Sequence, residues 1–294
     1  MDRPISAASL LAAQTRIANM AIRTPLLRLN LDDAPADIYL KLENLQPIGS
    51  FKIRGAANAI QLADRARLAA GVWTASAGNM AQGVAWCARR LGLDCTVVVP
   101  DTAPVTKLDA ISRLGANTIT IPFAAWLDVF HTRRFDGLDG HFVHAFSDPA
   151  VMAGNGTIAL EILDELPDVD TVITPYGGGG LSCGVATAFR HFKPDTSCFA
   201  AEVDVSAPLA ASLAAGEMVT VEHKPSFVDG IGAPFPFPEM WEMARQLLDG
   251  TLVSSVDEIA FAVRLLVERN RVIAEGAGAA SLAAALSGQA GSGK

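Results

Sequence analysis

Gln46-Pro47-Ile48-Gly49-Ser50-Phe51-Lys52-Ile53-Arg54-Gly55 is the stretch on which both the predicted fold and the predicted chemistry of this chain depend. The alternating run at residues 38–42 predicts a strand before it, and the alanine-rich residues that follow predict a helix. Ser50 is placed to cap this helix, and Lys52 then falls in its first turn. The helix macrodipole disfavours an ammonium there, which suits a lysine whose amine must lose its proton. Taken alone, such a stretch more often carries a solvated lysine on a loop.

The composition of the whole chain narrows the function classes. Its 294 residues are 50% hydrophobic and 18% charged, and the net charge of -8 argues against a nucleic-acid or anionic-membrane partner. No apolar run approaches the length of a membrane span, and the first residues do not open a signal peptide. Four cysteines without metal-ligand spacing predict reduced core thiols. These features fit a cytoplasmic enzyme or a cytoplasmic binding protein.

Strand and helix patterns alternate along the chain. Residues 95–100 form a continuous apolar run, which is typical of a buried parallel strand. Further strands are predicted at 71–76, 118–121, 172–175 and 198–203, with a short one after Pro25. Helices are predicted at 5–20, 80–90, 104–114, 153–166, 183–191, 208–215, 239–248 and 256–270, and a final alanine-rich helix follows Glu275-Gly276-Ala277-Gly278 and ends at Leu286. This alternation implies βαβ crossovers, and therefore an α/β protein with parallel sheets.

Four consecutive glycines, Gly177 to Gly180, lie between a predicted strand and a predicted helix. Glycine backbone can turn tightly and present several N–H groups to an anion at a helix N-terminus, so a phosphate site is expected. Glu202 lies about twenty residues further on and keeps a dinucleotide-binding oxidoreductase as a weaker alternative. A phosphate site together with a lysine suited to deprotonation suggests pyridoxal 5′-phosphate.

These motifs closely resemble the serine/threonine dehydratase family of fold-type II pyridoxal-phosphate enzymes. The resemblance runs through residues 41–56, 76–83, 177–181 and 275–278, in the same order and spacing, and covers nearly the whole chain. It implies a tryptophan synthase β-like fold of two open twisted parallel-sheet domains with the cofactor in the interdomain cleft. The large domain would comprise residues 1–70 and 148–294, and the small domain, residues 71–147, would be inserted in it.

The resemblance also assigns site residues. Lys52 would be the catalytic lysine, joined to the cofactor as an imine. The implied cofactor-binding residues are Phe51, Lys52, Asn79, Gly177, Gly178, Gly179, Gly180, Leu181, Gly230 and Glu275. The implied substrate-carboxylate residues are Ser76, Ala77, Gly78, Asn79 and Met80.

The implied reaction is β-elimination of a β-hydroxy-α-amino acid such as serine, threonine or phenylserine, to a 2-oxo acid and ammonia. The sequence Phe-Lys-Ile-Arg at residues 51–54 favours elimination over the replacement reactions of related synthases. A homodimeric enzyme of amino-acid catabolism, with no nucleic-acid or membrane partner, is expected. Three alternatives stay open: an inactive or metabolite-binding homologue, a hydroxyaspartate ammonia-lyase, and an amino-acid racemase. Ala77 stands where racemases of this family present a serine hydroxyl, which disfavours the last.

Three departures from the family pattern matter. Met80 replaces the histidine usual after the asparagine, which leaves the preferred substrate open. Some relatives bind a divalent cation with the counterparts of Glu202, Ser206 and an acid two residues on; this chain has Pro208 there, so no metal is predicted. The Ser-Gly-Gly-type turn that would contact the pyridine nitrogen is not found before Lys294, because Ser287-Gly288 comes too early, so either this sequence is truncated or its terminus differs.

Overall fold

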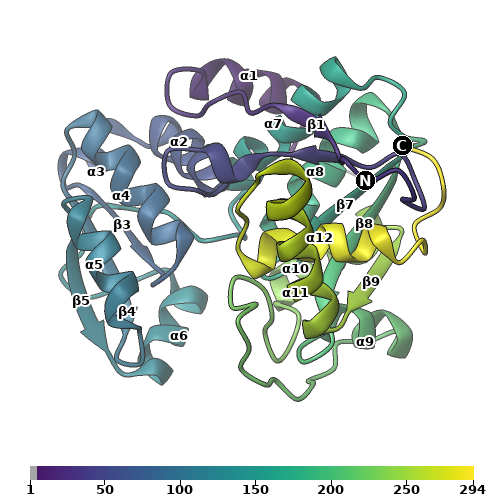
Figure 1. The fold of residues 1–294 in the computed structure, drawn as a ribbon. Helices are drawn as coiled ribbons and strands as arrows, with labels where there is room; N and C mark the ends of the chain where they lie inside the picture. Colours follow the sequence, from purple (N-terminus) through teal and green to yellow (C-terminus); the bar gives the residue numbers. More distant parts are fainter. Residues whose placement is uncertain (1–4) are drawn as a thin grey trace. The chain divides into compact units, whose positions relative to one another are not determined.

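The computed structural model describes residues 5–294, apart from the side chain of Phe130, and these residues form two compact units (Figure 1). Of the described residues, the first unit takes 5–7, 24–44 and 156–294, and the second takes 8–23 and 45–155. One helix, α7 (Pro149–Glu165), contributes to both. The domain limits implied by the resemblance stay a prediction.

The second unit is built on a parallel sheet of order β5-β4-β3-β6. Five of the six residues of β4 are buried, because this valine-rich strand is covered on both faces. Helices α4, α5 and α6 pack against this sheet, and α2 packs against α4. The strands are β3 (Val72–Ala75), β4 (Cys95–Pro100), β5 (Asn117–Ile121) and β6 (His141–Phe142). The helices are α1 (Ala7–Ile17), α2 (Lys52–Leu62), α3 (Arg65–Ala69), α4 (Asn79–Leu91), α5 (Val105–Arg113) and α6 (Phe123–Thr132).

The first unit contains a parallel sheet of order β7-β8-β9 and a separate antiparallel pair, β1-β2. The C-terminal helix α12, yellow in Figure 1, packs against all three parallel strands and against α11. The strands are β1 (Leu26–Arg28), β2 (Tyr39–Lys41), β7 (Thr171–Pro175), β8 (Ser197–Val203) and β9 (Gly250–Ser254). The helices are α8 (Gly180–Phe192), α9 (Pro208–Ala215), α10 (Pro238–Leu247), α11 (Val256–Leu265), its π-helical continuation Leu266–Asn270, and α12 (Gly276–Leu286).

Local sequence signals account for several element ends. Ser255 and Glu258 form a capping box that starts α11, with the Ser255 hydroxyl accepting from the Glu258 N–H and the Glu258 carboxylate accepting from the Ser255 N–H. Gly92 ends α4 in the left-handed conformation at φ 68°, which glycine adopts without steric cost. The predicted parallel strands are present, and β4 and α9 have their predicted limits.

Four elements were not predicted: α3, β6, α6 and β9. Two of them, β6 and β9, depend on a neighbouring strand, because β6 has only two residues and β9 begins at a glycine. Pairing with β3 and with β8, respectively, makes them strands. The predicted helix at 183–191 begins instead at Gly180, and the final alanine-rich helix begins at Gly276, so each glycine-containing turn leads directly into its helix.

All four cysteines are free and buried, as predicted for core thiols. Among residues 5–294, no helix is both long and apolar enough to span a membrane.

Candidate active site

Lys52 is the first residue of α2. A turn closed by the Gly49 N–H, which donates to the Gln46 carbonyl at 2.7 Å, leads the chain into the helix, with Gly49 in the left-handed region at φ 73°. Ser50 is not the N-cap residue as expected: Phe51 takes that position, and the Ser50 hydroxyl accepts from the Lys52 N–H at 3.4 Å. The lysine is therefore placed in the first turn, as predicted, by a turn rather than by a side-chain cap.

The side chain of Lys52 is half-buried and held at its end. Its Nζ donates to the backbone carbonyl of Ala145 at 3.0 Å, and it lies 5.2 Å from the centre of the Phe51 ring. Ala145 follows strand β6, 93 positions further along the chain. This amine is thus fixed inside the second unit rather than solvated on a loop.

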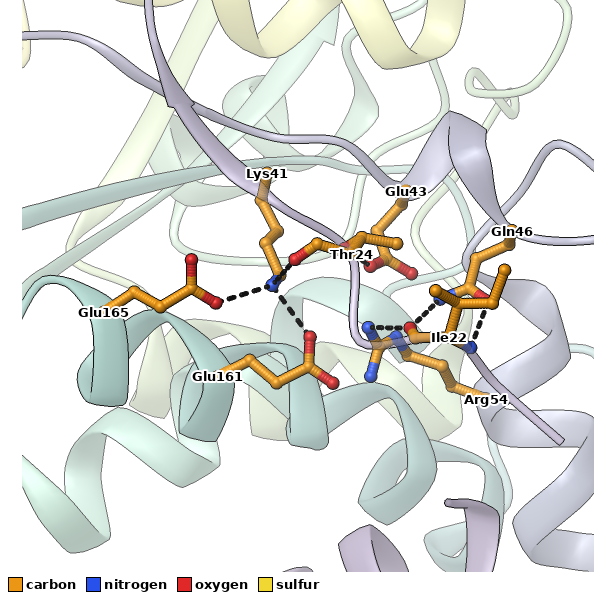
Figure 2. Close-up of polar contacts among 8 residues, drawn as sticks. All are labelled: Ile22, Thr24, Lys41, Glu43, Gln46, Arg54, Glu161 and Glu165. Carbon is orange, nitrogen blue, oxygen red and sulfur yellow. Dashed lines mark hydrogen bonds and ion pairs between the residues drawn. The ribbon is translucent and has the colours of Figure 1, made fainter. Parts of the chain in front are cut away.

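Two other polar residues of the lysine motif serve the scaffold (Figure 2). Gln46 exchanges two hydrogen bonds with the backbone of Ile22, at 2.8 and 2.9 Å. Arg54, only 1% exposed, donates from its guanidinium to the same Ile22 carbonyl at 3.2 Å. Both therefore tie the lysine-bearing segment to the chain that follows α1.

Glycines allow two helices to approach α2 closely. A Cβ on Gly83 of α4 would lie 3.3 Å from the backbone carbonyl of Lys52. A Cβ on Gly55 would lie 2.9 Å from the backbone oxygen of Val151 in α7. Any larger residue at these positions would push a helix away from the segment that carries the lysine.

The predicted carboxylate-binding turn precedes α4 in the same unit. Ser76 continues from β3, and its hydroxyl accepts from the Gly78 N–H at 3.2 Å. Gly78 is the N-cap residue of α4 and has no side chain to bond the first-turn N–H groups, so this helix N-terminus suits an anion. Met80 is 2% exposed, so its side chain packs in the core. The structure therefore brings this turn and Lys52 together on packed helices α4 and α2.

The four-glycine run lies in the first unit, between the end of β7 at Pro175 and the start of α8 at Gly180. Gly179 is the N-cap residue of α8 and takes a positive φ of 86°, and α8 then begins at Gly180. With no side chain at the cap, first-turn N–H groups and the helix dipole are directed toward one place. This arrangement fits an anionic oxygen group such as a phosphate.

Two more predicted site residues lie close to this run. The position of a Cβ on Gly177 is 3.5 Å from the Gly230 carbonyl oxygen. A Cβ on Gly230 would lie 3.4 Å from the Glu275 carboxylate and 2.7 Å from the Ala277 side chain. The first unit thus gathers the glycine run, Gly230 and Glu275, which are distant in sequence, and the contact with Ala277 leaves no space for a side chain on Gly230.

Glu202 is used within the protein. Its two carboxylate oxygens accept from the Leu209 and Ala210 N–H groups, at 2.9 and 2.7 Å, and so cap α9. Burial raises the pKa of Glu202 to about 7, against the lowering effect of these two hydrogen bonds. No group of three or more His, Cys, Asp or Glu side chains in the described part of the chain could hold a metal ion.

One set of residues was missed from the sequence. The segment from His144 to Ser147, whose Ala145 carbonyl accepts from the Lys52 amine, is not among the predicted site residues. No local pattern marks this segment, because its relation to Lys52 depends on the pairing of β6 with β3.

Known proteins resemble this chain over most of its length. A family model described as "pyridoxal-phosphate dependent enzyme" matches residues 17–294. L-threonine ammonia-lyase of Thermotoga maritima is 40% identical over 279 residues, which are 93% of this chain and 69% of the relative. The catabolic L-threonine dehydratase TdcB of Escherichia coli K12 is 36% identical over 291 residues, 98% of this chain and 88% of the relative. The structure of maize serine racemase superposes with a TM-score of 0.90 at 33% identity, covering 97% of this chain and 87% of that one. These matches confirm the predicted α/β fold class.

Proposed function

Because the chain belongs to the family of pyridoxal-phosphate-dependent enzymes, we propose that it is an ammonia-lyase that removes water and ammonia from a β-hydroxy-α-amino acid, with threonine or serine as first candidates. The observation that carries the proposal is the half-buried amine of Lys52 at the start of α2, held by the Ala145 carbonyl. A lysine in this setting suits a nucleophilic or basic role of its amine better than a role in solubility.

The residues present fit the cofactor, pyridoxal 5′-phosphate. The side-chain-free turn before α8 suits its phosphate, and Gly230, with the Glu275 carboxylate close to it, lies beside the same turn. In this proposal Gly177 to Leu181 would hold the phosphate, the amine of Lys52 would hold the aldehyde, and Phe51, Asn79, Gly230 and Glu275 would contact the ring. When bound, the cofactor supplies an electron-withdrawing ring that delocalises the electron pair left at Cα of the substrate.

The chain's own residues perform the remaining tasks. First-turn N–H groups of α4, with Ser76 and Ala77 in the preceding turn, receive the substrate carboxylate as an anion at a helix N-terminus. The amine of Lys52 would act as the base that takes the proton from Cα of the substrate. The Cα–H and Cβ–O bonds break and water leaves. Hydrolysis of the released enamine then gives the 2-oxo acid and ammonia, so the balance needs no oxidant or reductant.

Racemisation is the second candidate, because a serine racemase is among the structures most similar to this chain. A racemase must return a proton to the opposite face of Cα. Ala77 offers no proton donor at the position that the family resemblance assigns to this task. The proposal therefore expects 2-oxo acid, rather than the D-amino acid, as the main product.

A substrate panel tests the proposal. The purified protein with pyridoxal phosphate is offered L-serine, L-threonine, phenylserine and 3-hydroxyaspartate, and 2-oxo acid, ammonia and D-amino acid are measured. Lys52→Ala should abolish turnover and the cofactor's protein-bound visible absorbance. Lys224→Ala, at a lysine whose side chain is 62% exposed, serves as the matched control and should retain both. Absence of 2-oxo acid from every substrate would refute the ammonia-lyase assignment.

The homodimer and the cytoplasmic location belong to the same proposal. Light scattering of the purified protein would measure its mass in solution, and a mass of one chain would contradict the dimer.

A further inference from the structure

We infer that His144 is a positioning residue for Lys52: its imidazole shapes the turn whose Ala145 carbonyl holds the lysine amine. The inference rests on the proposed function, because it assigns a role to a residue that supports the cofactor-binding lysine. It is drawn entirely from contacts within the second unit.

His144 lies at the end of an anchored strand. Val143 continues β6, with its N–H donating to the Trp73 carbonyl at 2.8 Å. The Thr74 hydroxyl donates to the Val143 carbonyl at 2.8 Å in a buried position. The backbone up to Val143 is therefore held by β3, and the turn begins at His144.

The imidazole of His144 organises this turn. Its Nδ1 accepts from the Phe146 N–H at 3.2 Å and from the Ser147 N–H at 3.0 Å. Two backbone donors on one ring nitrogen require Nδ1 to be unprotonated, which places the proton of the neutral ring on Nε2. The ring is 1% exposed and meets Phe142 and Phe146 edge-on, with centroids 5.9 and 4.6 Å away. The aromatic contacts therefore fix the position of the imidazole, and the two N–H donors fix Nδ1 as its acceptor atom.

Along the chain, Ala145 lies between His144 and the two residues whose N–H groups the imidazole binds, Phe146 and Ser147. Drawing the Phe146 and Ser147 N–H groups toward His144 fixes the peptide units on either side of Phe146, and the first of these contains the Ala145 carbonyl. The Ala145 carbonyl then faces the Lys52 amine at 3.0 Å. Arg133 supports the far end of the turn, donating to the Ser147 carbonyl at 3.3 Å and to its hydroxyl at 3.0 Å.

The Lys52 backbone is fixed independently by α2 and by the close approach of Gly83. The flexible part is the four-carbon side chain, and the Ala145 carbonyl is a hydrogen-bond acceptor at its end. A shift of that carbonyl by about 1 Å is enough to cost up to a hundredfold in rate at a reacting centre. The role of His144 is therefore expected to show in the reactivity of Lys52.

The test compares three variants in cofactor-stripped protein. His144→Leu removes the acceptor. His144→Asn keeps it, because Oδ1 of asparagine stands as many bonds from Cα as Nδ1 of histidine and can bind the N–H groups two and three residues on. His141→Leu, on the same strand, is the matched control, since the His141 Nε2 makes no hydrogen bond in the described structure.

Two readouts separate positioning from general damage. The first is the rate at which added pyridoxal phosphate becomes fixed to Lys52 after borohydride quenching, measured by mass spectrometry. The second is the equilibrium affinity for pyridoxine 5′-phosphate, which has no aldehyde and does not need the lysine. For His144→Leu, capture of Lys52 should slow about tenfold or more while pyridoxine phosphate affinity stays unchanged. His144→Asn and His141→Leu should react nearly as fast as the wild type.

Capture at the wild-type rate in His144→Leu would overturn the inference, as would slow capture in His144→Asn. If the leucine variant fails to bind pyridoxine phosphate, His144→Gln decides, because its acceptor lies one bond further from Cα. Slow capture of Lys52 in the glutamine variant, with normal capture in the asparagine variant, supports the inference. Equal capture rates in these two variants refute it. A wild-type protein that binds no pyridoxal phosphate would overturn the proposed function and this inference with it, whereas the other outcomes leave the proposed function intact.

Discussion

Replacing Lys41 with methionine tests the most deeply buried ion pair of the first unit. Lys41 Nζ lies 2.7 Å from the Glu161 carboxylate, and the two side chains are only 8% and 7% exposed. Nζ also donates to the Thr24 carbonyl at 2.5 Å and lies 3.7 Å from Glu165, which is 30% exposed (Figure 2). Lys41→Met preserves most of the volume but removes the ammonium that lies 2.7 Å from the Glu161 carboxylate.

The structure sets the size of the effect. Removing one partner of a buried ion pair costs about 3–5 kcal/mol, because the remaining charge is still desolvated. The Glu165 pair adds little, since that carboxylate is partly solvated. We therefore expect Lys41→Met to lower the free energy of unfolding by about 3–5 kcal/mol, and the double variant Lys41→Met/Glu161→Gln to lose less than the single one.

Equilibrium unfolding in urea, followed by tryptophan fluorescence and by far-UV circular dichroism, measures these changes. Arg264→Met is the matched control, because its pair with Glu268 is exposed, 74% and 49%, and should contribute nothing measurable. A loss below about 1 kcal/mol for Lys41→Met, or additive losses in the double variant, would refute the reasoning.

Two further predictions follow from packing and from titration. Gly154→Ala would place a Cβ 2.8 Å from the carbonyl carbon of Arg54, a backbone atom that cannot swing aside, so the melting temperature should fall by an amount equivalent to about 1–3 kcal/mol or more. Gly278→Ala, whose nearest neighbour would be 3.7 Å away, should leave it unchanged or slightly higher; equal losses would contradict the packing argument. For Glu202, a folded-state pKa near 7 against an ordinary value of 4.5 means that the folded protein binds more protons than the unfolded chain between these pH values. The contribution of Glu202 to the free energy of unfolding of the wild type should therefore fall as pH rises from about 4.5 to about 7. Over the same pH window, the free energy of unfolding of Glu202→Gln relative to wild type should rise by up to roughly 3 kcal/mol. Urea titrations at several pH values check this, and a pH-independent difference would contradict it.

Much of the fold could be predicted because short sequence patterns indicate where its strands and helices begin and end. Buried strand β4 is marked by its own valines, and the ends of α4 and α11 by a glycine and a capping box. The lysine at the start of a helix and the glycine run between strand and helix are also local features, and both lie where expected. Such signals are readable because periodicity, capping and backbone freedom involve residues only a few positions apart.

Partners that lie far apart in the sequence could not be predicted in this way. The carbonyl that holds Lys52 comes from a strand of two residues, and the carboxylate that pairs with Lys41 comes from α7. Glu202 capping α9, and Gly154 admitting the backbone of Arg54, are likewise outcomes of packing. The residue types in the lysine and glycine motifs are enough to indicate the chemistry. Which carbonyl, charge or helix meets them depends on long-range strand pairing and helix packing, because a buried polar group takes as its partner whatever the folded chain places within hydrogen-bonding distance.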